Sequence, residues 1–218
     1  MSIRENVRAV QERIAVAAAR AGRDAGSVTL VAIAKTTDAA GVREAVAAGV
    51  THIGENRLQE AERKTDALAD LAGQITWHMV GHLQTNKAKA VMERFAILHS
   101  VDSVRLGEFL DRHATRRVPV FLEVNVAREA AKQGFSPEAL PPAVAHLRRC
   151  PNLDIRGLMA MAPLAGDPEA ARPVFRRLRE VAHAEGLHEL SMGMTRDFEA
   201  AIAEGATMVR IGRAIFNA

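Results

Sequence analysis

The chain has 218 residues, of which 48% are hydrophobic and 25% charged, a composition typical of one soluble globular domain and too apolar for a disordered chain. The 29 Lys and Arg against 26 Asp and Glu give a net charge of +3, and the two signs are interleaved, which argues against nucleic acid as a partner. No apolar stretch is long enough to cross a bilayer, and the first residues contain no apolar signal core, so no membrane association is expected. The single cysteine, Cys150, excludes an internal disulfide framework and predicts a cytoplasmic protein.

Short β-branched apolar runs alternate along the chain with stretches in which apolar residues recur every three or four positions. The apolar runs predict strands at 28–35, 51–55, 75–80, 97–101, 118–126, 154–161, 188–192 and 207–211. The periodic stretches predict helices at 38–48, 57–71, 84–95, 103–115, 137–149, 168–185 and 196–204. A further helix is expected at 3–21, ahead of the first strand.

This alternation predicts parallel strands joined by crossover helices, because parallel neighbours cannot be connected by tight turns. Eight such units are the number that closes a (β/α)8 (TIM) barrel. An open doubly wound sheet is the alternative, and it usually needs only about five or six strands. We expect a single domain over 1–218, with an N-terminal helix and lead-in at 1–27 and the barrel at 28–216. In such a barrel the functional residues follow the carboxyl ends of the strands.

A lysine, Lys35, ends the first predicted strand. An ammonium group at the end of a buried strand is costly, and desolvation favours the neutral amine that attacks a carbonyl. Lys35 is therefore a candidate Schiff-base residue; the alternative is that it extends from the rim to pair with an acid. The other four lysines lie in polar surroundings and are expected on the surface or in loops.

Polar residues also follow the second and third strands. Asn56 could line a pocket mouth, or it could serve only as a cap or turn residue. His78 and His82 lie on either side of Gly81 and do not share a helix face, so a zinc site is not expected. The methionines at 159, 161, 192 and 194 are expected to fill the barrel.

Glycines mark the ends of the last two strands, in the segments Ser191–Thr195 and Arg210–Arg213. Glycine lets backbone N–H groups approach an anion, and phosphate sites in these barrels form after strands seven and eight. Arg210 lies within the last strand, where a permanent cation needs an anionic or acceptor partner. The alternative is two ordinary turns and an arginine paired to a structural carboxylate.

A Schiff-base lysine opposite a phosphate site suggests pyridoxal 5′-phosphate (PLP) as the cofactor, with its aldehyde at Lys35 and its ring nitrogen facing Arg210. At this point the chain closely resembles the pyridoxal phosphate homeostasis protein family, the single-domain relatives of the alanine racemase N-terminal barrel. The resemblance covers about Val28 to Phe216 and is carried by the motifs Val31–Thr36, Gly54–Asn56, Trp77–Gly81, Leu83–Lys87, Gly157–Ala160 and Ser191–Phe216.

The resemblance implies a role for each residue of a PLP site. Lys35 would form the Schiff base, Arg210 would face the pyridine nitrogen, and Asn56 would lie against the ring. The phosphate would be held by glycines, by Thr195 and by the amide of Arg213. The complete expected set of cofactor-binding residues is Lys35, Asn56, Ser191, Gly193, Thr195, Arg210, Gly212 and Arg213.

The chain departs from the family pattern at three places. His82 stands where the family usually has proline, and Arg213 stands where it usually has a small hydroxyl residue. The loop 127–134 keeps Lys132 but lacks the usual serines around it. A second, transient cofactor site would use lysines of this kind, namely Lys87, Lys89 or Lys132.

An arginine facing the pyridine nitrogen keeps that nitrogen unprotonated, which weakens the ring as an electron sink. Related racemases tolerate such an arginine but need a tyrosine from a further domain as a second base, and this chain contains 0 tyrosines. The sequence therefore favours a monomeric carrier in PLP homeostasis, without turnover, whose partners are PLP and the apo-enzymes that receive it. A PLP-dependent racemase and a Schiff-base aldolase remain the alternatives.

Overall fold

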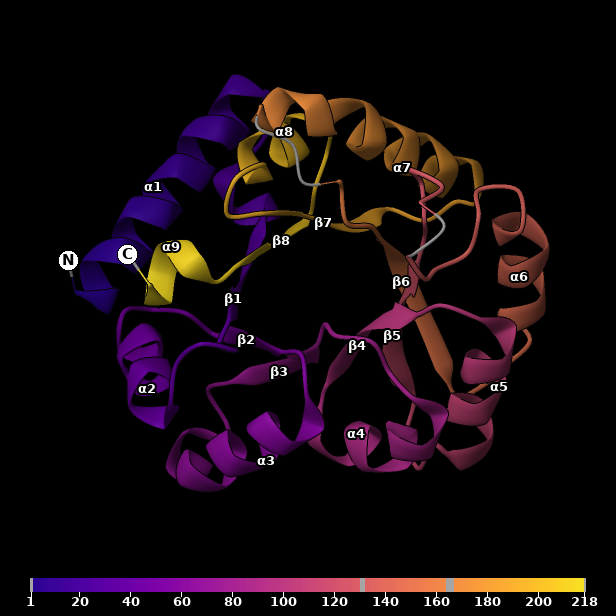
Figure 1. Cartoon of the computed structure of the whole chain (residues 1–218), viewed down its shortest axis with the longest axis horizontal. Helices are drawn as coiled ribbons and strands as arrows, with labels where there is room; N and C mark the ends of the chain where they lie inside the picture. Colours follow the sequence, from indigo (N-terminus) through magenta and orange to yellow (C-terminus); the bar gives the residue numbers. More distant parts are fainter. Residues whose placement is uncertain (1, 130–131, 164–166, 218) are drawn as a thin grey trace.

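The eight strands form one closed parallel barrel in the order β1 to β8, with β8 pairing back onto β1. The computed structural model describes residues 2–129, 132–163 and 167–217. Figure 1 views this barrel with the helices arranged around it. The strands are β1 (Thr29–Ile33), β2 (His52–Glu55), β3 (Thr76–Met79), β4 (Ile97–Val101), β5 (Val118–Glu123), β6 (Leu153–Met159), β7 (Glu189–Met194) and β8 (Met208–Ile211). The (β/α)8 barrel predicted from the sequence is confirmed.

The helices are α1 (Ile3–Arg20), α2 (Ala39–Ala47), α3 (Leu58–Ala67), α4 (Ala88–Arg94), α5 (Val104–His113), α6 (Leu140–Leu147), α7 (Arg172–Ala184), α8 (Phe198–Ala203) and α9 (Arg213–Phe216). Short 3-10 turns precede β1, α4 and α7 and follow α3. Three predicted helices, at 57–71, 84–95 and 168–185, therefore each divide into an α-helix and a 3-10 turn. Helix α9 was not predicted.

The predicted helix at 137–149 begins later, at Leu140, because Pro141 and Pro142 follow immediately. A proline lacks an N–H and fits only the first turn, where that group has no helical acceptor. These two prolines therefore fix the start of α6.

Helix α1 joins the two ends of the described chain. Ser2 and Glu5 form a capping box at its start, and its buried face, which includes Val7, Val10 and Ile14, packs against α8 and α9. The side-chain amide of Asn6 donates to the carbonyl of Ile215 at 3.0 Å. In Figure 1 the two termini accordingly lie close together, beside α1 and α9.

Two apolar layers stabilise the barrel. Inside it, a small cluster fills the space between strands: Val31, Ile33, Phe121, Met159 and Met208. A larger core between strands and helices holds most of the remaining buried side chains. None of the described helices combines the length and apolar character that a membrane crossing requires.

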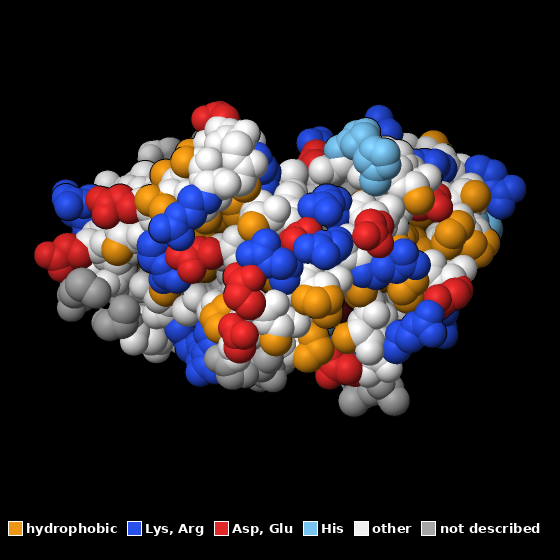
Figure 2. All heavy atoms as spheres, turned by 90° about the horizontal axis from the view of Figure 1, so that it is seen from above, with side chains coloured by type: hydrophobic (Ala, Val, Ile, Leu, Met, Phe, Trp, Pro, Cys, Tyr) orange, Lys and Arg blue, Asp and Glu red, His pale blue; other side chains and the backbone are white. Residues whose placement is uncertain are grey.

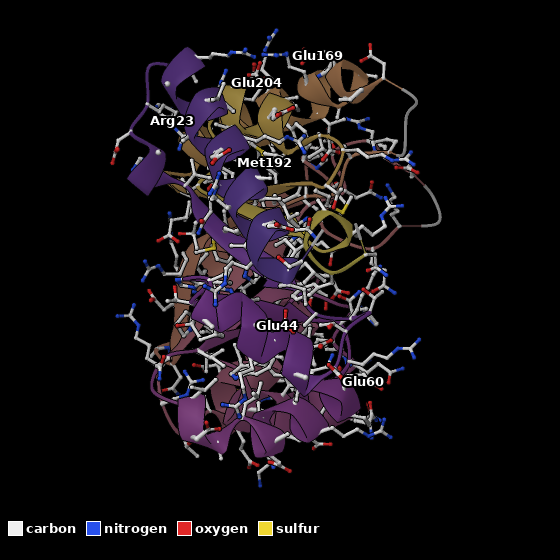
Figure 3. All side chains as sticks on the ribbon, turned by 90° about the vertical axis from the view of Figure 1, so that its left-hand side faces the viewer. Arg23, Glu44, Glu60, Glu169, Met192 and Glu204 are labelled. Atoms are coloured by element: carbon white, nitrogen blue, oxygen red, sulfur yellow. The ribbon has the colours of Figure 1, made fainter. Side chains whose placement is uncertain are left out.

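Charged side chains of both signs are mixed over the face shown in Figure 2. At one end of the molecule, where Figure 3 labels Glu169 and Glu204, several pairs are linked. Glu204 is 4% exposed and forms ion pairs with Arg172, Arg176 and Arg179, all within 3.5 Å. This cluster connects α7 to the end of α8, so these three arginines of α7 have a structural role.

Candidate functional site

The carboxyl ends of β1, β7 and β8 surround a cavity of about 460 Å³. Five predicted site residues line it: Lys35, Thr195, Arg210, Gly212 and Arg213. Residues from opposite ends of the sequence meet here because β8 pairs with β1, which places Val31 opposite Arg210. The cavity lies at the end of the barrel where this fold places its functional residues.

Lys35 lies in the loop that follows β1, and its side chain is exposed. The expectation of a buried, desolvated amine is therefore wrong: the strand ends at Ile33, and the chain turns outward before the lysine. The suggested alternative, pairing with an acid, is not observed among the described residues, where Lys35 has no carboxylate within ion-pair distance. The amine is available to a ligand in the cavity.

A buried ion pair holds the loop that carries Lys35. Lys64 of α3 is 4% exposed, and its ammonium donates to Glu55 at 2.5 Å and to the carbonyl of Ala34 at 2.6 Å. The prediction that Lys64 is a surface residue is wrong. The polar residues around it in the sequence suggested exposure, but its side chain faces the ends of β1 and β2. Glu55, the last residue of β2, is fully buried in this pair.

Arg210 crosses the floor of the cavity and is 5% exposed. Its Nη1 donates to the carbonyl and to the hydroxyl of Ser191, both at 2.6 Å, and its Nη2 donates to the carbonyl of Ala160 at 3.0 Å. Burial lowers the pKa of Arg210 to about 10, and the carboxylates of Glu123 and Asp197 act in the opposite direction. The partners are neutral acceptors, so the alternative of an arginine paired to a structural carboxylate does not hold among the described residues.

The donors of Arg210 are not all used. A guanidinium group has five N–H bonds. Three are directed to the acceptors just named, and one on Nη2 and the one on Nε have no acceptor within the described part of the chain. These two are free to bind a neutral or anionic acceptor in the cavity.

Two glycines lie at the ends of β7 and β8, and Gly212 lines the cavity next to the end of β1. Gly193 has φ +92°, and a Cβ there would lie 2.9 Å from the Cα of Phe198, so only glycine fits. A Cβ on Gly212 would lie 3.0 Å from the carbonyl oxygen of Ile33. The backbone N–H groups of Thr195, Gly212 and Arg213 have no acceptor among the residues described. Such amides can bind an anion.

Three predicted site residues do not line this cavity: Asn56, Ser191 and Gly193, the last of which lies within β7. Asn56 is exposed at the end of β2 and lines a separate cavity of about 150 Å³ together with His82 and Lys87. Ser191 is fully buried inside the barrel, where it contacts Arg210 and His99. Ser191 therefore reaches the cavity only through the arginine that it orients.

The structure also adds residues to the cavity. Lys132 lines it and pairs with Glu129 at 2.5 Å, while residues 130 and 131 of the same loop lie outside the described chain. Met161 lines the cavity and is 40% exposed, so its assignment to the barrel filling is wrong. Met159 lies inside the barrel as predicted, whereas Met192 is buried in the outer core and Met194 lines the cavity. Met161 follows β6, beyond the last inward-facing residue of the strand.

His78 and His82, the two histidines considered as a zinc site, lie in different environments. His78 is fully buried and hydrogen-bonded to His52 and His99, whereas His82 is exposed and lies 3.3 Å from Asp102. The described residues contain no group of three side chains able to hold a metal ion. Sequence reasoning missed the histidine cluster, whose only signal was one histidine in each of three consecutive strands.

The barrel and this cavity define a class of protein that comparison with known families identifies. The sequence profile of the alanine racemase N-terminal domain matches residues 3–218. Alanine racemase from Corynebacterium glutamicum shares the fold, with a TM-score of 0.69 and 18% identity over 96% of this chain and 61% of the racemase.

More similar proteins carry a narrower name. The pyridoxal phosphate homeostasis protein of Pseudomonas aeruginosa is 46% identical over 100% of this chain and 96% of its own length, and that of Escherichia coli is 36% identical over 99% and 96%. PipY of Synechococcus elongatus, whose structure was solved with PLP bound, has a TM-score of 0.82 and 40% identity, covering 88% of this chain and 93% of PipY. The chain belongs to the pyridoxal phosphate homeostasis protein family, within the alanine racemase N-terminal domain family.

Proposed function

We propose that this protein binds PLP through a Schiff base at Lys35 and stores and delivers the cofactor without turning over a substrate. The observation that carries the proposal is the meeting, in one cavity, of an accessible amine with two N–H groups of Arg210 and the backbone amides of Thr195, Gly212 and Arg213, all without an acceptor among the described residues. The PLP bound to PipY, a relative 40% identical, supports the choice of ligand.

The residues present fit the cofactor. The free N–H groups of Arg210 suit the pyridine nitrogen, which accepts one hydrogen bond, and the amides of Thr195, Gly212 and Arg213 suit a phosphate. Arg213 adds a positive charge near this group in place of a hydroxyl. Bound PLP supplies an aldehyde for Lys35 and a ring that can withdraw electrons. Arg210 limits that withdrawal, because an arginine does not give its proton to the ring nitrogen.

Asn56 is proposed as a contact of the ring, which requires its side chain to turn from the neighbouring cavity toward Lys35. Ser191 and Gly193 are proposed to act indirectly. The serine orients Arg210, and the glycine sets the path of the turn that presents Thr195.

A titration tests the anchor. Adding PLP to the protein should produce a visible absorbance band that saturates at one PLP per chain. Lys35→Ala should abolish the band, while Lys132→Ala, which removes another cavity lysine, should keep it. An unchanged band in Lys35→Ala would reject Lys35 as the anchor, and a colourless wild-type protein would reject PLP binding altogether.

A transfer assay tests delivery. The loaded protein is mixed with an apo PLP-dependent enzyme in the presence of a phosphatase that destroys free PLP. Recovery of enzyme activity above that with free PLP indicates direct delivery, and equal recovery contradicts it. Sustained exchange of an amino-acid α-proton in heavy water at an enzyme-like rate would favour the racemase alternative.

A further inference from the structure

A chain of hydrogen bonds crosses the interior of the barrel and ends at Arg210. Three members come from neighbouring strands, His52 from β2, His78 from β3 and His99 from β4, and the fourth, Ser191, comes from β7, which is not adjacent to β4. His52 Nδ1 lies 2.9 Å from His78 Nε2, His78 Nδ1 lies 2.8 Å from His99 Nε2, and His99 Nδ1 lies 2.8 Å from Ser191 Oγ. His52, at the far end, lines a cavity of about 370 Å³ at the amino ends of β1 and β2. The hydrogen bonds therefore link His52, at the amino end of β2, to Arg210 in the floor of the candidate site.

The direction of this chain follows from its last link. Arg210 has donors only, so the hydroxyl of Ser191 must accept from it. The remaining hydroxyl proton has one acceptor among the described residues, His99 Nδ1. An unprotonated Nδ1 places the His99 proton on Nε2, which donates to His78 Nδ1. The same reasoning places the His78 proton on Nε2, facing His52.

Electrostatics favours the same direction. In this arrangement every proton in the chain points away from the positive charge of Arg210, and every lone pair points toward it. The reverse arrangement would direct three N–H dipoles at the guanidinium. Burial is the main cause that lowers the pKa values of His78 and His99, with neighbouring histidines contributing to both and Arg210 to His99, so both rings remain neutral.

We propose that His99, supported by His78 and His52, is a positioning residue for Arg210. It fixes the Ser191 hydroxyl as an acceptor, so that Nη1 is fully occupied and the free N–H groups on Nη2 and Nε are directed into the cavity. Without His99 the hydroxyl loses its acceptor and can rotate its proton toward other groups, and the guanidinium loses a fixed partner. The expected effect on PLP binding rests on the proposed function, whereas the direction of the hydrogen bonds between the histidines does not.

The direction is tested on the ligand-free wild-type protein. With ¹⁵N-labelled histidine, NMR should show that His52, His78 and His99 are all neutral near pH 7 and carry their proton on Nε2. A proton on Nδ1 of any of the three rings, or a doubly protonated ring, would overturn the proposal. This readout is independent of PLP and of the success of any variant.

Two substitutions at one position test the positioning role. In His99→Asn the side-chain amide oxygen occupies the place of Nδ1 and can accept from Ser191; in His99→Phe no acceptor remains, and the ring keeps its apolar contact with Phe121. Loss of a hydrogen bond in a network with a charged group weakens binding by roughly tenfold. We expect PLP affinity to fall by about that factor in His99→Phe and to stay within about threefold in His99→Asn.

Equal loss of PLP affinity in the two variants, with equal loss of thermal stability, would show that His99 has only a structural role. If the wild-type protein bound no PLP, the proposed function would fail, and the NMR measurement would still decide the direction of the chain. If both PLP binding and the tautomers were as expected and only the phenylalanine variant were impaired, the positioning role would be supported.

Discussion

The buried polar groups of the scaffold and the polar groups of the cavity differ in how many hydrogen-bond partners they have. Inside the scaffold, Lys64 is paired with Glu55 and with a carbonyl, and the three buried or half-buried histidines are linked to one another. In the cavity, Lys35 is exposed, and two N–H groups of Arg210 have no acceptor among the described residues. Because an unpaired buried polar group is costly, unused donors in a cavity indicate a place prepared for a ligand.

The largest expected effect of breaking the paired region is at Lys64. Lys64→Met leaves the Glu55 carboxylate buried without its cation, which should lower the free energy of unfolding by about 3–5 kcal/mol. Urea unfolding followed by circular dichroism measures this loss. The double variant Lys64→Met, Glu55→Leu removes both charges and should recover much of it. A loss below about 1 kcal/mol in the single variant would contradict the buried pair.

The histidine chain makes stability depend on pH. Burial lowers the pKa of His78 to about 3 and that of His99 well below its usual value. The unfolded polypeptide therefore binds more protons than the folded protein below about pH 6.5. As the pH is lowered, the free energy of unfolding should decrease by up to about 1.4 kcal/mol per pH unit for each histidine. The raised pKa of Glu123 acts in the opposite direction at lower pH. Between pH 6.5 and 5, the free energy of unfolding measured with urea should change less steeply with pH in His99→Phe than in the wild type. Equal slopes would contradict neutral histidines in the folded protein.

A smaller effect is expected at Gly193, which lies in β7 just before the turn that carries Thr195. Gly193→Ala introduces a Cβ 2.6 Å from that of Ala201 at a positive φ, which should lower stability by about 1–3 kcal/mol. Gly73→Ala is the matched control, because a Cβ there meets nothing within 4 Å. Thermal unfolding compares the two variants. Equal stability of both would mean that the turn can relax and that the glycine is not needed for its shape.

The arrangement of strands was predictable because each buried parallel strand is a short apolar run, and the helices between them repeat every three or four residues. The surroundings of single polar side chains were not. Lys64 lies in a polar stretch, and only the packing of α3 on the ends of β1 and β2 shows that it is buried. The links between His52, His78 and His99 depend on the stagger of adjacent strands, which pairs His78 with Gly54 and with Ile97.

The cavity itself was partly predictable. Lys35 and Thr195 follow strands and Arg210 lies near the end of β8, and strand ends meet in a barrel. Exposure was not predictable, because it depends on where a strand stops: β1 ends at Ile33 and so leaves Lys35 in the loop.

The most direct test of the account is to find which residue holds PLP. The protein is loaded with PLP, reduced with borohydride to make the linkage permanent, digested and analysed by mass spectrometry. The account predicts one modified peptide, with the added mass on Lys35. Modification of Lys132 or Lys64 in its place, or no modification, would contradict it.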